Sequence, residues 1–398
     1  VLKDVGDSMK VDLSGQVWAQ IEQAQTRAKH HLDEGRSEEA AAEYRRCANL
    51  LRQYSQYAID ASVRKQRLER AEKFDQLAAR IQSGLMGQAV SESSALDDYR
   101  ETVRGLVTKT DVGWDEIGGL EETKREIQTA YALALARKPE GVRMRSPRNI
   151  LLYGPPGTGK TLLAAATSHE LDATFFNVRV SDMLSKYFGE SSKLISALYR
   201  EAGAQAPSVV FLDEFDALTA AREGDESGAE RRVLSTLLSE LDGLDNKRKD
   251  EKHYVLTIAA TNIPWQIDKA VISRFGARLI YVPLPDEAAR RAILEIEIER
   301  KGHASEVSVA ALARALGGYS GREIEAVVGH AVASMVRRTN PDLLQQASLG
   351  REALAAYTLK VGVLTVADFE SAQMAIRPTT TPKDVARFEL WRQQIEVE

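Results

Sequence analysis

The sequence has little that would suit an exported or membrane-spanning protein. It contains one cysteine, Cys47, so no disulfide can form within the chain, as expected in a reducing compartment. It has no run of about 18 apolar residues that could span a bilayer. Its start lacks a basic stretch followed by an apolar core, so we expect no signal peptide. The net charge of −5 gives no electrostatic reason for direct nucleic-acid binding. We therefore expect a cytoplasmic protein.

The composition, with 43% hydrophobic and 28% charged residues, excludes a disordered or collagen-like chain and suits several folded domains. Residues 14–82 contain no proline and carry apolar residues at helical spacing, which predicts three helices packed as a small bundle. The predicted segments are a tail (1–12), this bundle (13–83), a linker (84–111), an α/β domain (112–285), a helical domain (286–377) and a C-terminal helix with its tail (378–398).

Within residues 112–285, short apolar runs alternate with helix-like segments. This alternation is typical of a parallel sheet covered by helices. The expected strands are Asn149–Tyr153, Thr174–Val178, Ser208–Leu212, Tyr254–Thr261 and Arg278–Val282.

A glycine-rich loop, GPPGTGKT at Gly154–Thr161, joins the first of these strands to a helix-like segment. Glycines let backbone N–H groups curl around phosphate oxygens, and the following helix start adds positive potential. Lys160 can bridge the β- and γ-phosphates, and Thr161 can bind Mg²⁺. ATP and Mg²⁺ are therefore the expected nucleotide and metal. The expected nucleotide-binding positions in the loop are Pro155, Pro156, Gly157, Thr158, Gly159, Lys160, Thr161 and Leu162.

Two later strands end in polar residues. The run VVFLDE ends in Asp213, which would hold Mg²⁺ through water, and Glu214, which would polarise the attacking water as general base. The run AATN ends in Asn262, which would orient water near the γ-phosphate. The sequence thus predicts catalytic roles for Lys160, Glu214 and Asn262.

Together, the loop and the two strand ends resemble an AAA ATPase, an α/β P-loop fold with an all-helical small domain, over Val112–Arg377. Further marks of this family are VGWDEIGGL (112–120), ATNIPWQID (260–268), YVPLPD (281–286) and GGYSGREIE (317–325). ATNIPWQ and the RPTTTPKD tail resemble the meiotic clade, which holds katanin, spastin, fidgetin and the Vps-type ATPases with their archaeal counterpart CdvC. The resemblance implies that Asp115, Ile117 and Gly118 flank the adenine and that Gly321 closes over adenine and ribose.

The resemblance also implies an arginine finger at Arg274, which would reach the γ-phosphate of a neighbouring subunit. A finger that acts in trans implies a homo-oligomeric ring, in this family a hexamer. The clade usually has two adjacent arginines where this chain has Ser273 and Arg274. Either one finger suffices or the coupling between subunits is weaker.

A pore loop is implied at SDMLSKYFGE (181–190), where Lys186, Tyr187 and Phe188 would project into the central channel of the ring. An aromatic ring there can insert between substrate side chains without reading their sequence. The segment Arg222–Arg232 would hold a second pore loop.

The N-terminal bundle resembles a MIT domain, through small residues at Ala24 and Ala28 and the Glu39–Ala48 string. Such domains bind tails of ESCRT-III-type proteins in their inter-helix grooves. The bundle also carries a basic run, which either attracts an acidic tail or is a solvated helix face. Its residues are Arg64, Lys65, Arg67 and Arg70.

The leading interpretation is a ring that threads polypeptide through its pore and disassembles ESCRT-III-like polymers, touching membrane only through that substrate. Microtubule severing, as in katanin and spastin, and general unfolding are the alternatives. A scaffold that binds ATP without hydrolysing it would have another residue in place of Lys160 or Glu214, and this chain has both. HExxH is absent, which excludes an attached zinc protease, and the ending EVE differs from that of proteasomal activators. Residues 340–362 look helical rather than like a β-insertion, so the chain departs here from the Vps-type enzymes that recycle ESCRT-III, and the archaeal, CdvC-like interpretation is favoured.

Overall fold

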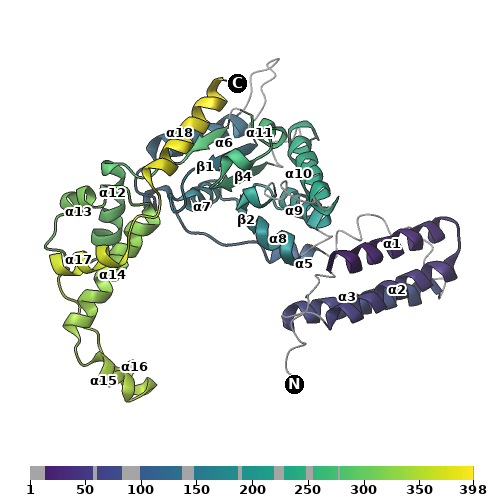
Figure 1. The fold of residues 1–398 in the computed structure, drawn as a ribbon, viewed down its shortest axis with the longest axis horizontal. Coiled ribbons are helices and arrows are strands. Elements are labelled where there is room, and N and C mark those ends of the chain that lie inside the picture. Colours follow the sequence, from purple (N-terminus) through teal and green to yellow (C-terminus); the bar gives the residue numbers. More distant parts are fainter. Residues whose placement is uncertain are drawn as a thin grey trace, which may run out of the picture. The chain divides into compact units, whose positions relative to one another are not determined.

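The computed structural model describes residues 14–56, 61–82, 99–136, 148–186, 191–218, 228–247, 254–276 and 278–397 (Figure 1). Contacts divide the chain into two units, Val1–Ala95 and Leu96–Glu398, and each is described by itself. Among the described helices, none has the length and apolar character needed to cross a membrane.

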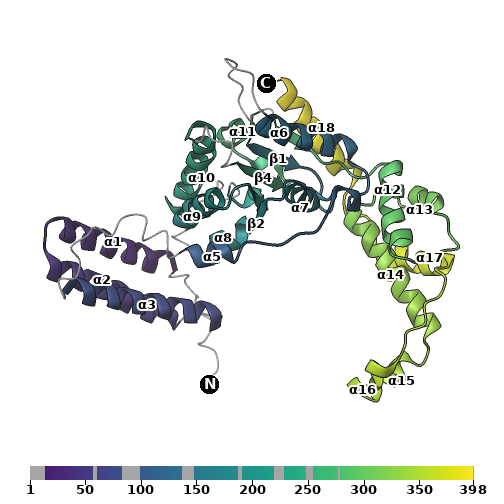
Figure 2. The same cartoon turned by 180° about the vertical axis from the view of Figure 1, so that it is seen from behind.

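The first unit is a bundle of three helices, α1 (Ser14–Asp33), α2 (Ser37–Ser55) and α3 (Ala61–Gln82), which lie side by side in Figure 2. The turn between α1 and α2 uses Gly35 at φ +74°, a conformation that favours glycine. The core is rich in alanine, which lets the helices approach closely, and its fully buried alanines are Ala24, Ala28, Ala40, Ala41, Ala48, Ala71 and Ala78. The predicted three-helix bundle is confirmed.

Aromatic contacts fix the helices of this bundle against one another. Tyr44 of α2 stacks on Phe74 of α3, with ring centroids 6.0 Å apart. The Arg67 guanidinium lies 3.7 Å from the centroid of the Tyr54 ring and donates to the Tyr54 carbonyl at 3.0 Å. Arg70 lies over Phe74 at 5.9 Å. Two residues of the predicted basic run are therefore engaged in contacts within the bundle.

The structure describes only the last part of the linker predicted over 84–111. Residues 83–98 lie outside the described residues, and from Tyr99 the chain packs within the second unit. Val103, in α5 (Arg100–Arg104), is fully buried, and Val107 forms an antiparallel bridge with Phe176 at the edge of the sheet. Isolated apolar residues without a period gave no sign of this packing, because their partners lie far along the chain.

The second unit contains a parallel sheet with strand order β2-β3-β4-β1-β5, which confirms the predicted α/β P-loop fold. The strands agree with the predicted ones to within a residue at each end and are β1 (Asn149–Tyr153), β2 (Thr174–Arg179), β3 (Ser208–Asp213), β4 (Val255–Thr261) and β5 (Leu279–Tyr281). Successive residues of a strand face opposite layers. Val210 thus joins the core under α9 (Ser191–Ala204) and α10 (Gly228–Lys247), whereas Val209 joins the core under α6 (Glu121–Leu135) and α7 (Lys160–Glu170). Burial on both faces explains the continuous apolar runs.

The helices of the sheet domain are α6 (Glu121–Leu135), α7 (Lys160–Glu170), α8 (Val180–Lys186), α9 (Ser191–Ala204), α10 (Gly228–Lys247) and α11 (Lys269–Phe275). Short helical turns lie at η1 (Trp114–Glu116), η2 (Phe215–Leu218) and η5 (Pro264–Gln266).

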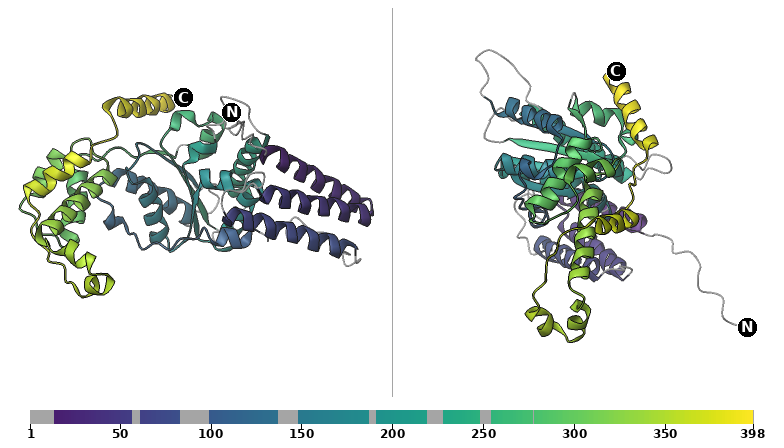
Figure 3. Two further views of the ribbon diagram at one scale, coloured as in Figure 1. Left: turned by 60° about the horizontal axis from the view of Figure 1, so that its bottom comes forward. Right: turned by 90° about the vertical axis from the view of Figure 1, so that its left-hand side faces the viewer.

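The helical domain that follows has its own apolar core, to which Leu294, Ile324 and Phe369 contribute fully buried side chains. Its helices, green to yellow in Figure 3, are α12 (Glu287–Leu294), the π-helical turn η6 (Glu295–Arg300), α13 (Val309–Ala315), α14 (Gly321–Thr339), α15 (Leu343–Ser348), α16 (Arg351–Ala356) and α17 (Val366–Ala375). Because α15 and α16 are helices, the prediction of a helical segment over 340–362 is confirmed. The last helix, α18 (Pro382–Val397), packs Phe388 and Trp391 back against the sheet domain.

Candidate functional site

The glycine-rich loop leaves β1 after Tyr153 and enters α7 at Lys160. Gly154, Gly157 and Gly159 have φ values of +153°, +75° and +97°, which side chains with a Cβ rarely adopt. A Cβ on Gly154 would lie only 2.1 Å from the Val282 carbonyl oxygen. These glycines are thus required by the backbone path itself. Pro156 and Leu162 are exposed beside the loop.

Lys160 lies inside the loop that precedes it. Its Nζ donates to the carbonyl oxygens of Gly154 at 2.9 Å and Pro155 at 2.7 Å, and Thr158 Oγ1 closes the same turn by donating to Pro155 at 2.9 Å. Burial lowers the pKa of Lys160 to about 8, against the attraction of Asp213. The loop thus holds a poorly solvated cation, which a phosphate group would stabilise.

Two oxygen ligands suited to Mg²⁺ meet beside the loop. Thr161 Oγ1, in the first turn of α7, donates to Asp213 Oδ2 at the end of β3, with 3.3 Å between the atoms. Among the described residues, no group of three or more His, Cys, Asp or Glu side chains is placed to hold a metal ion. This sparse donor set fits Mg²⁺, which usually keeps several waters and takes its other ligands from nucleotide phosphates.

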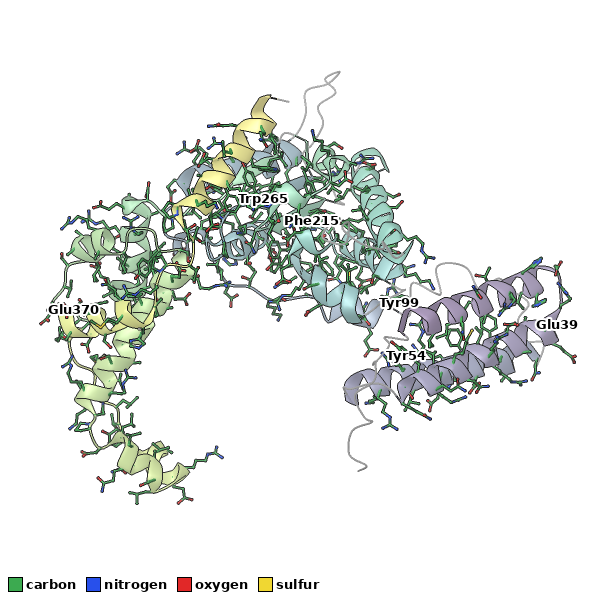
Figure 4. All side chains as sticks on the ribbon, in the orientation of Figure 1. Glu39, Tyr54, Tyr99, Phe215, Trp265 and Glu370 are labelled. Atoms are coloured by element: carbon green, nitrogen blue, oxygen red, sulfur yellow. The ribbon has the colours of Figure 1, made fainter. Side chains whose placement is uncertain are left out.

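Glu214 follows Asp213 with φ +53°, a value that is uncommon for a residue other than glycine. Its carboxylate accepts a hydrogen bond from Ser181 Oγ, and its Oε1 lies 3.5 Å from Arg179 Nε. The next residue, Phe215, labelled in Figure 4, is fully buried. Its ring meets that of Phe275 edge-on, with ring centroids 5.7 Å apart. This buried ring anchors the turn and thereby fixes where the Glu214 backbone lies.

Asn262 directly follows β4, whose neighbours in the sheet are β3 and β1. Thr261 Oγ1, just before it, donates to Asp216 Oδ1 at 2.7 Å and so ties the end of β4 to the turn after β3. Because the strands are parallel, Asn262, Glu214 and the phosphate loop all lie at the carboxyl edge of the sheet, where ligands bind in open α/β folds.

Two of the glycines expected near the adenine, Gly118 and Gly321, lie against the same residue of the helical domain, Ile293. A Cβ on Gly118 would lie 2.5 Å from Ile293 N, and one on Gly321 would lie 3.7 Å from Ile293 Cδ1. Ile117, next to Gly118, is buried. The sequence analysis missed Ile293 because an apolar residue in an amphipathic helix carries no mark of a ligand site.

Asp115 contacts the helical domain through Arg300. The Arg300 guanidinium donates to the Asp115 carbonyl oxygen at 2.8 Å and lies 3.5 Å from its Oδ2. The Asp115 carboxylate is thereby paired with a cation of the helical domain, so this residue joins the two sides of the predicted adenine site.

Arg274 is not brought together with the phosphate loop of its own chain. The Arg274 carbonyl oxygen accepts a hydrogen bond from the side-chain amide of Asn149, the first residue of β1, at 3.4 Å. The phosphate loop instead begins after Tyr153, the last residue of β1. At about 3.3 Å per residue, this places the two ends of the strand roughly 13 Å apart. The guanidinium forms an ion pair with Asp242 of α10 at 3.3 Å. Ser273 Oγ donates to the Ala270 carbonyl at 2.8 Å.

The predicted pore residues lie largely outside the described part of the chain. Lys186 is the last residue of α8, and Tyr187 and Phe188 follow it in a stretch that is not described. Of the predicted second loop, Arg222–Arg232, only the part from Gly228 onward, in α10, is described. Both pore loops therefore stay predictions.

Comparison with protein families finds the "ATPase family associated with various cellular activities (AAA)" over residues 150–284. The chain is 42% identical over 291 residues to the cell division cycle protein 48 homolog of Archaeoglobus fulgidus, which covers 71% of this chain and 38% of that protein. It is 36% identical over 285 residues to the katanin p60 ATPase-containing subunit A1 of Arabidopsis thaliana, and the match covers 70% of this chain and 54% of that protein. It is 34% identical over 290 residues to the spastin of Naegleria gruberi, covering 72% and 53%. The match thus spans about half or less of each relative.

Solved structures of AAA domains share the fold. The FIGL-1 AAA domain in complex with ADP matches 78% of this chain and 98% of its own, with a TM-score of 0.61 and 26% identity. A katanin structure, described as a structural basis for katanin self-assembly, matches 77% of this chain and 97% of its own, with a TM-score of 0.57 and 30% identity. The sheet order, the phosphate loop and these matches together show that the chain belongs to the AAA ATPase family.

Proposed function

We propose that this protein hydrolyses ATP and uses the energy to remodel a protein polymer, in the manner of a katanin- or spastin-type ATPase. One observation carries the hydrolytic part of this proposal. Lys160, the Thr161–Asp213 pair, Glu214 and Asn262 gather at the carboxyl edge of one parallel sheet.

Each of these residues has a distinct task in this proposal. The loop N–H groups and Lys160 bind the β- and γ-phosphates, and Thr161 and Asp213 hold Mg²⁺, which offsets phosphate charge. Glu214 accepts the proton of the attacking water, for which its carboxylate first leaves Arg179 and Ser181. Asn262 orients that water.

Hydrolysis requires a second copy of the chain in this proposal. Arg274 lies at the opposite end of β1 from its own phosphate loop, which supports a role at the site of a neighbouring subunit. A solved katanin structure, described as a structural basis for katanin self-assembly, also supports a homo-oligomer. We take the oligomer to be a hexameric ring whose pore carries Lys186, Tyr187 and Phe188.

The relatives favour microtubule severing over the disassembly of ESCRT-III-like polymers, which the sequence had put first. Katanin and spastin are both among them at 34–36% identity. An ESCRT-III-like polymer remains the second candidate, because the N-terminal unit is a three-helix bundle with an alanine-rich core, as in a MIT domain. In either case we expect a cytoplasmic protein that is recruited through its polymer.

The decisive experiment offers the full chain, with Mg²⁺ and ATP, either stabilised microtubules or filaments of an ESCRT-III-type protein. ATP turnover and polymer length are measured together, with Glu214→Gln as the inactive control. Shortening of microtubules only supports severing, whereas loss of the filaments only supports the second candidate. If turnover is normal and neither polymer changes, the substrate proposal is wrong. If the chain does not hydrolyse ATP at all, the active-site proposal is wrong.

A further inference from the structure

Lys124, in the first turn of α6, is a buried cation. Its side chain is only 10% exposed, and lysine is seldom buried unless its ammonium has hydrogen-bond partners. Lys124 Nζ donates to the Ile117 carbonyl oxygen at 2.7 Å and to Glu121 Oε1 at 2.9 Å. Because the Glu121 side chain is 73% exposed, water screens that ion pair, whereas the bond to Ile117 is buried. The stronger contact of Lys124 is therefore the one with a main-chain carbonyl that precedes its own helix.

The turn that contains Ile117 leads from η1 into α6 and has little room to move. The Ile117 side chain is buried in the core of the sheet domain. A Cβ on Gly118 would lie 2.5 Å from the Ile293 backbone nitrogen, in α12 of the helical domain. One on Gly119 would lie 2.3 Å from Ala289 Cβ, in the same helix. The turn thus packs against both domains, so a small shift of its main chain would disturb both contacts.

Two cations hold the main chain of this segment, and they come from different domains. Arg300 of the helical domain donates to the Asp115 carbonyl oxygen at 2.8 Å, but its side chain is exposed. Lys124 belongs to the sheet domain and is buried, so its bond to Ile117 does not depend on where the helical domain lies. A buried carbonyl that loses its donor is costly, and without the ammonium the turn would rearrange to reach another donor.

We propose that Lys124 is a positioning residue for the nucleotide base. Its ammonium fixes the main chain of Ile117 and Gly118, which are predicted to flank the adenine, and does not itself touch the nucleotide. The inference rests on that predicted adenine site. Lys124 could not be found from the sequence, because the motif VGWDEIGGL ends at Leu120 and a lysine in an amphipathic helix is usually solvated.

The test is calorimetric titration of the full chain, with Mg²⁺, against a non-hydrolysable ATP analogue and against inorganic tripolyphosphate. Both ligands offer the same phosphate chain to the loop, but only the first carries adenosine. Lys124→Met keeps the length of the side chain and removes the ammonium. We expect its affinity for the ATP analogue to fall about tenfold and its affinity for tripolyphosphate to stay unchanged. Arg125→Met, at the exposed next position of α6, is the matched control and should leave both affinities unchanged.

An unchanged affinity of the Met variant for the ATP analogue would overturn the inference. An equal loss for both ligands would overturn it too, since Lys124 would then support the whole site rather than the part that meets the base. Thermal unfolding checks that each variant folds. Should Lys124→Met fail to fold, Lys124→Gln, which keeps a neutral donor, decides by the same comparison and should show a smaller loss confined to the ATP analogue.

The unaltered chain tests the adenine site by itself. If it binds the ATP analogue no more tightly than tripolyphosphate, the base is not recognised, so the predicted adenine site is wrong and the role of Lys124 with it. If it binds the analogue more tightly and the Met variant does so by the same factor, the adenine site stands and only the role of Lys124 is wrong.

Discussion

Trp391 of the last helix meets Tyr153 edge-on, with ring centroids 4.7 Å apart, and Tyr153 is the residue directly before the phosphate loop. Trp265, three residues after Asn262 and labelled in Figure 4, lies in the same cluster. Its ring packs on that of Phe388, with ring centroids 5.1 Å apart. The C-terminal helix therefore contacts the chain on both sides of the active site, beside the end of β1 and after the end of β4.

We expect Trp391→Ala to destabilise the second unit by about 3 kcal/mol, because the indole is buried and its removal leaves a cavity against Tyr153. Urea unfolding followed by circular dichroism measures this. Leu390→Ala is the matched control, since Leu390 precedes Trp391 on the same helix and is 60% exposed. Its effect should stay within about 0.5 kcal/mol. Equal losses in the two variants would mean that the aromatic cluster does not hold the helix.

Glu214→Gln should bind ATP normally but hydrolyse it about 10²–10⁴-fold more slowly, because an amide cannot accept the proton of the attacking water. Single-turnover hydrolysis and nucleotide titration separate the two steps. Glu352→Gln, at an exposed position on α16, should leave both unchanged. Normal turnover in the Glu214 variant would assign the base to another residue.

The sequence predicted the sheet and the phosphate loop because their signals are local. The three inner strands β1, β3 and β4 are largely apolar runs buried on both faces, and the loop glycines lie where the backbone needs positive φ. Ile293 could not be predicted, because it reaches Gly118 only when the helical domain packs against a segment more than a hundred residues earlier in the chain. The burial of Val103 against the sheet domain was missed for the same reason.

Arg274→Ala should lose most ATP turnover and keep its affinity for nucleotide, since we propose that Arg274 acts at the site of a neighbouring subunit. Mixing this variant with Glu214→Gln provides a sharper test. In the mixture, a subunit of the Arg274 variant keeps its own Glu214, and a neighbouring subunit of the Glu214 variant supplies the missing arginine. This site is then complete, so turnover should reappear although each variant alone is inactive. Ser273→Ala controls for disturbance of α11. If mixing restores nothing, Arg274 does not act in trans.

Asp368→Asn should destabilise the helical domain by about 1–3 kcal/mol at pH 7. Burial disfavours the charged form of Asp368, but hydrogen bonds from Arg338 and Thr365 outweigh it and hold its pKa well below the usual range. A carboxyl with a lowered pKa in the folded state stabilises above its unfolded pKa of about 3.9, and this stabilisation is lost as pH falls below it. Denaturant unfolding at several pH values should therefore show that the difference in unfolding free energy between the Asn variant and the unaltered chain shrinks below about pH 4. A difference that does not change with pH would mean that the charge of Asp368 is not its source.

Nucleotide binding should take up protons at mildly alkaline pH, because burial lowers the pKa of Lys160 to about 8 in the free loop. A bound polyphosphate favours the charged ammonium and raises this pKa, so between the free and bound values the complex holds more protons than its parts. Calorimetry in buffers of different ionisation enthalpy should find proton uptake at about pH 8.5 and almost none at pH 6.5, where Lys160 is already charged. The affinity for nucleotide should fall as pH rises through 8. Lys160→Arg, which stays charged throughout this range, should abolish the uptake. Uptake that survives in the Arg variant would have to come from another group, and the charge state of Lys160 would then not control binding.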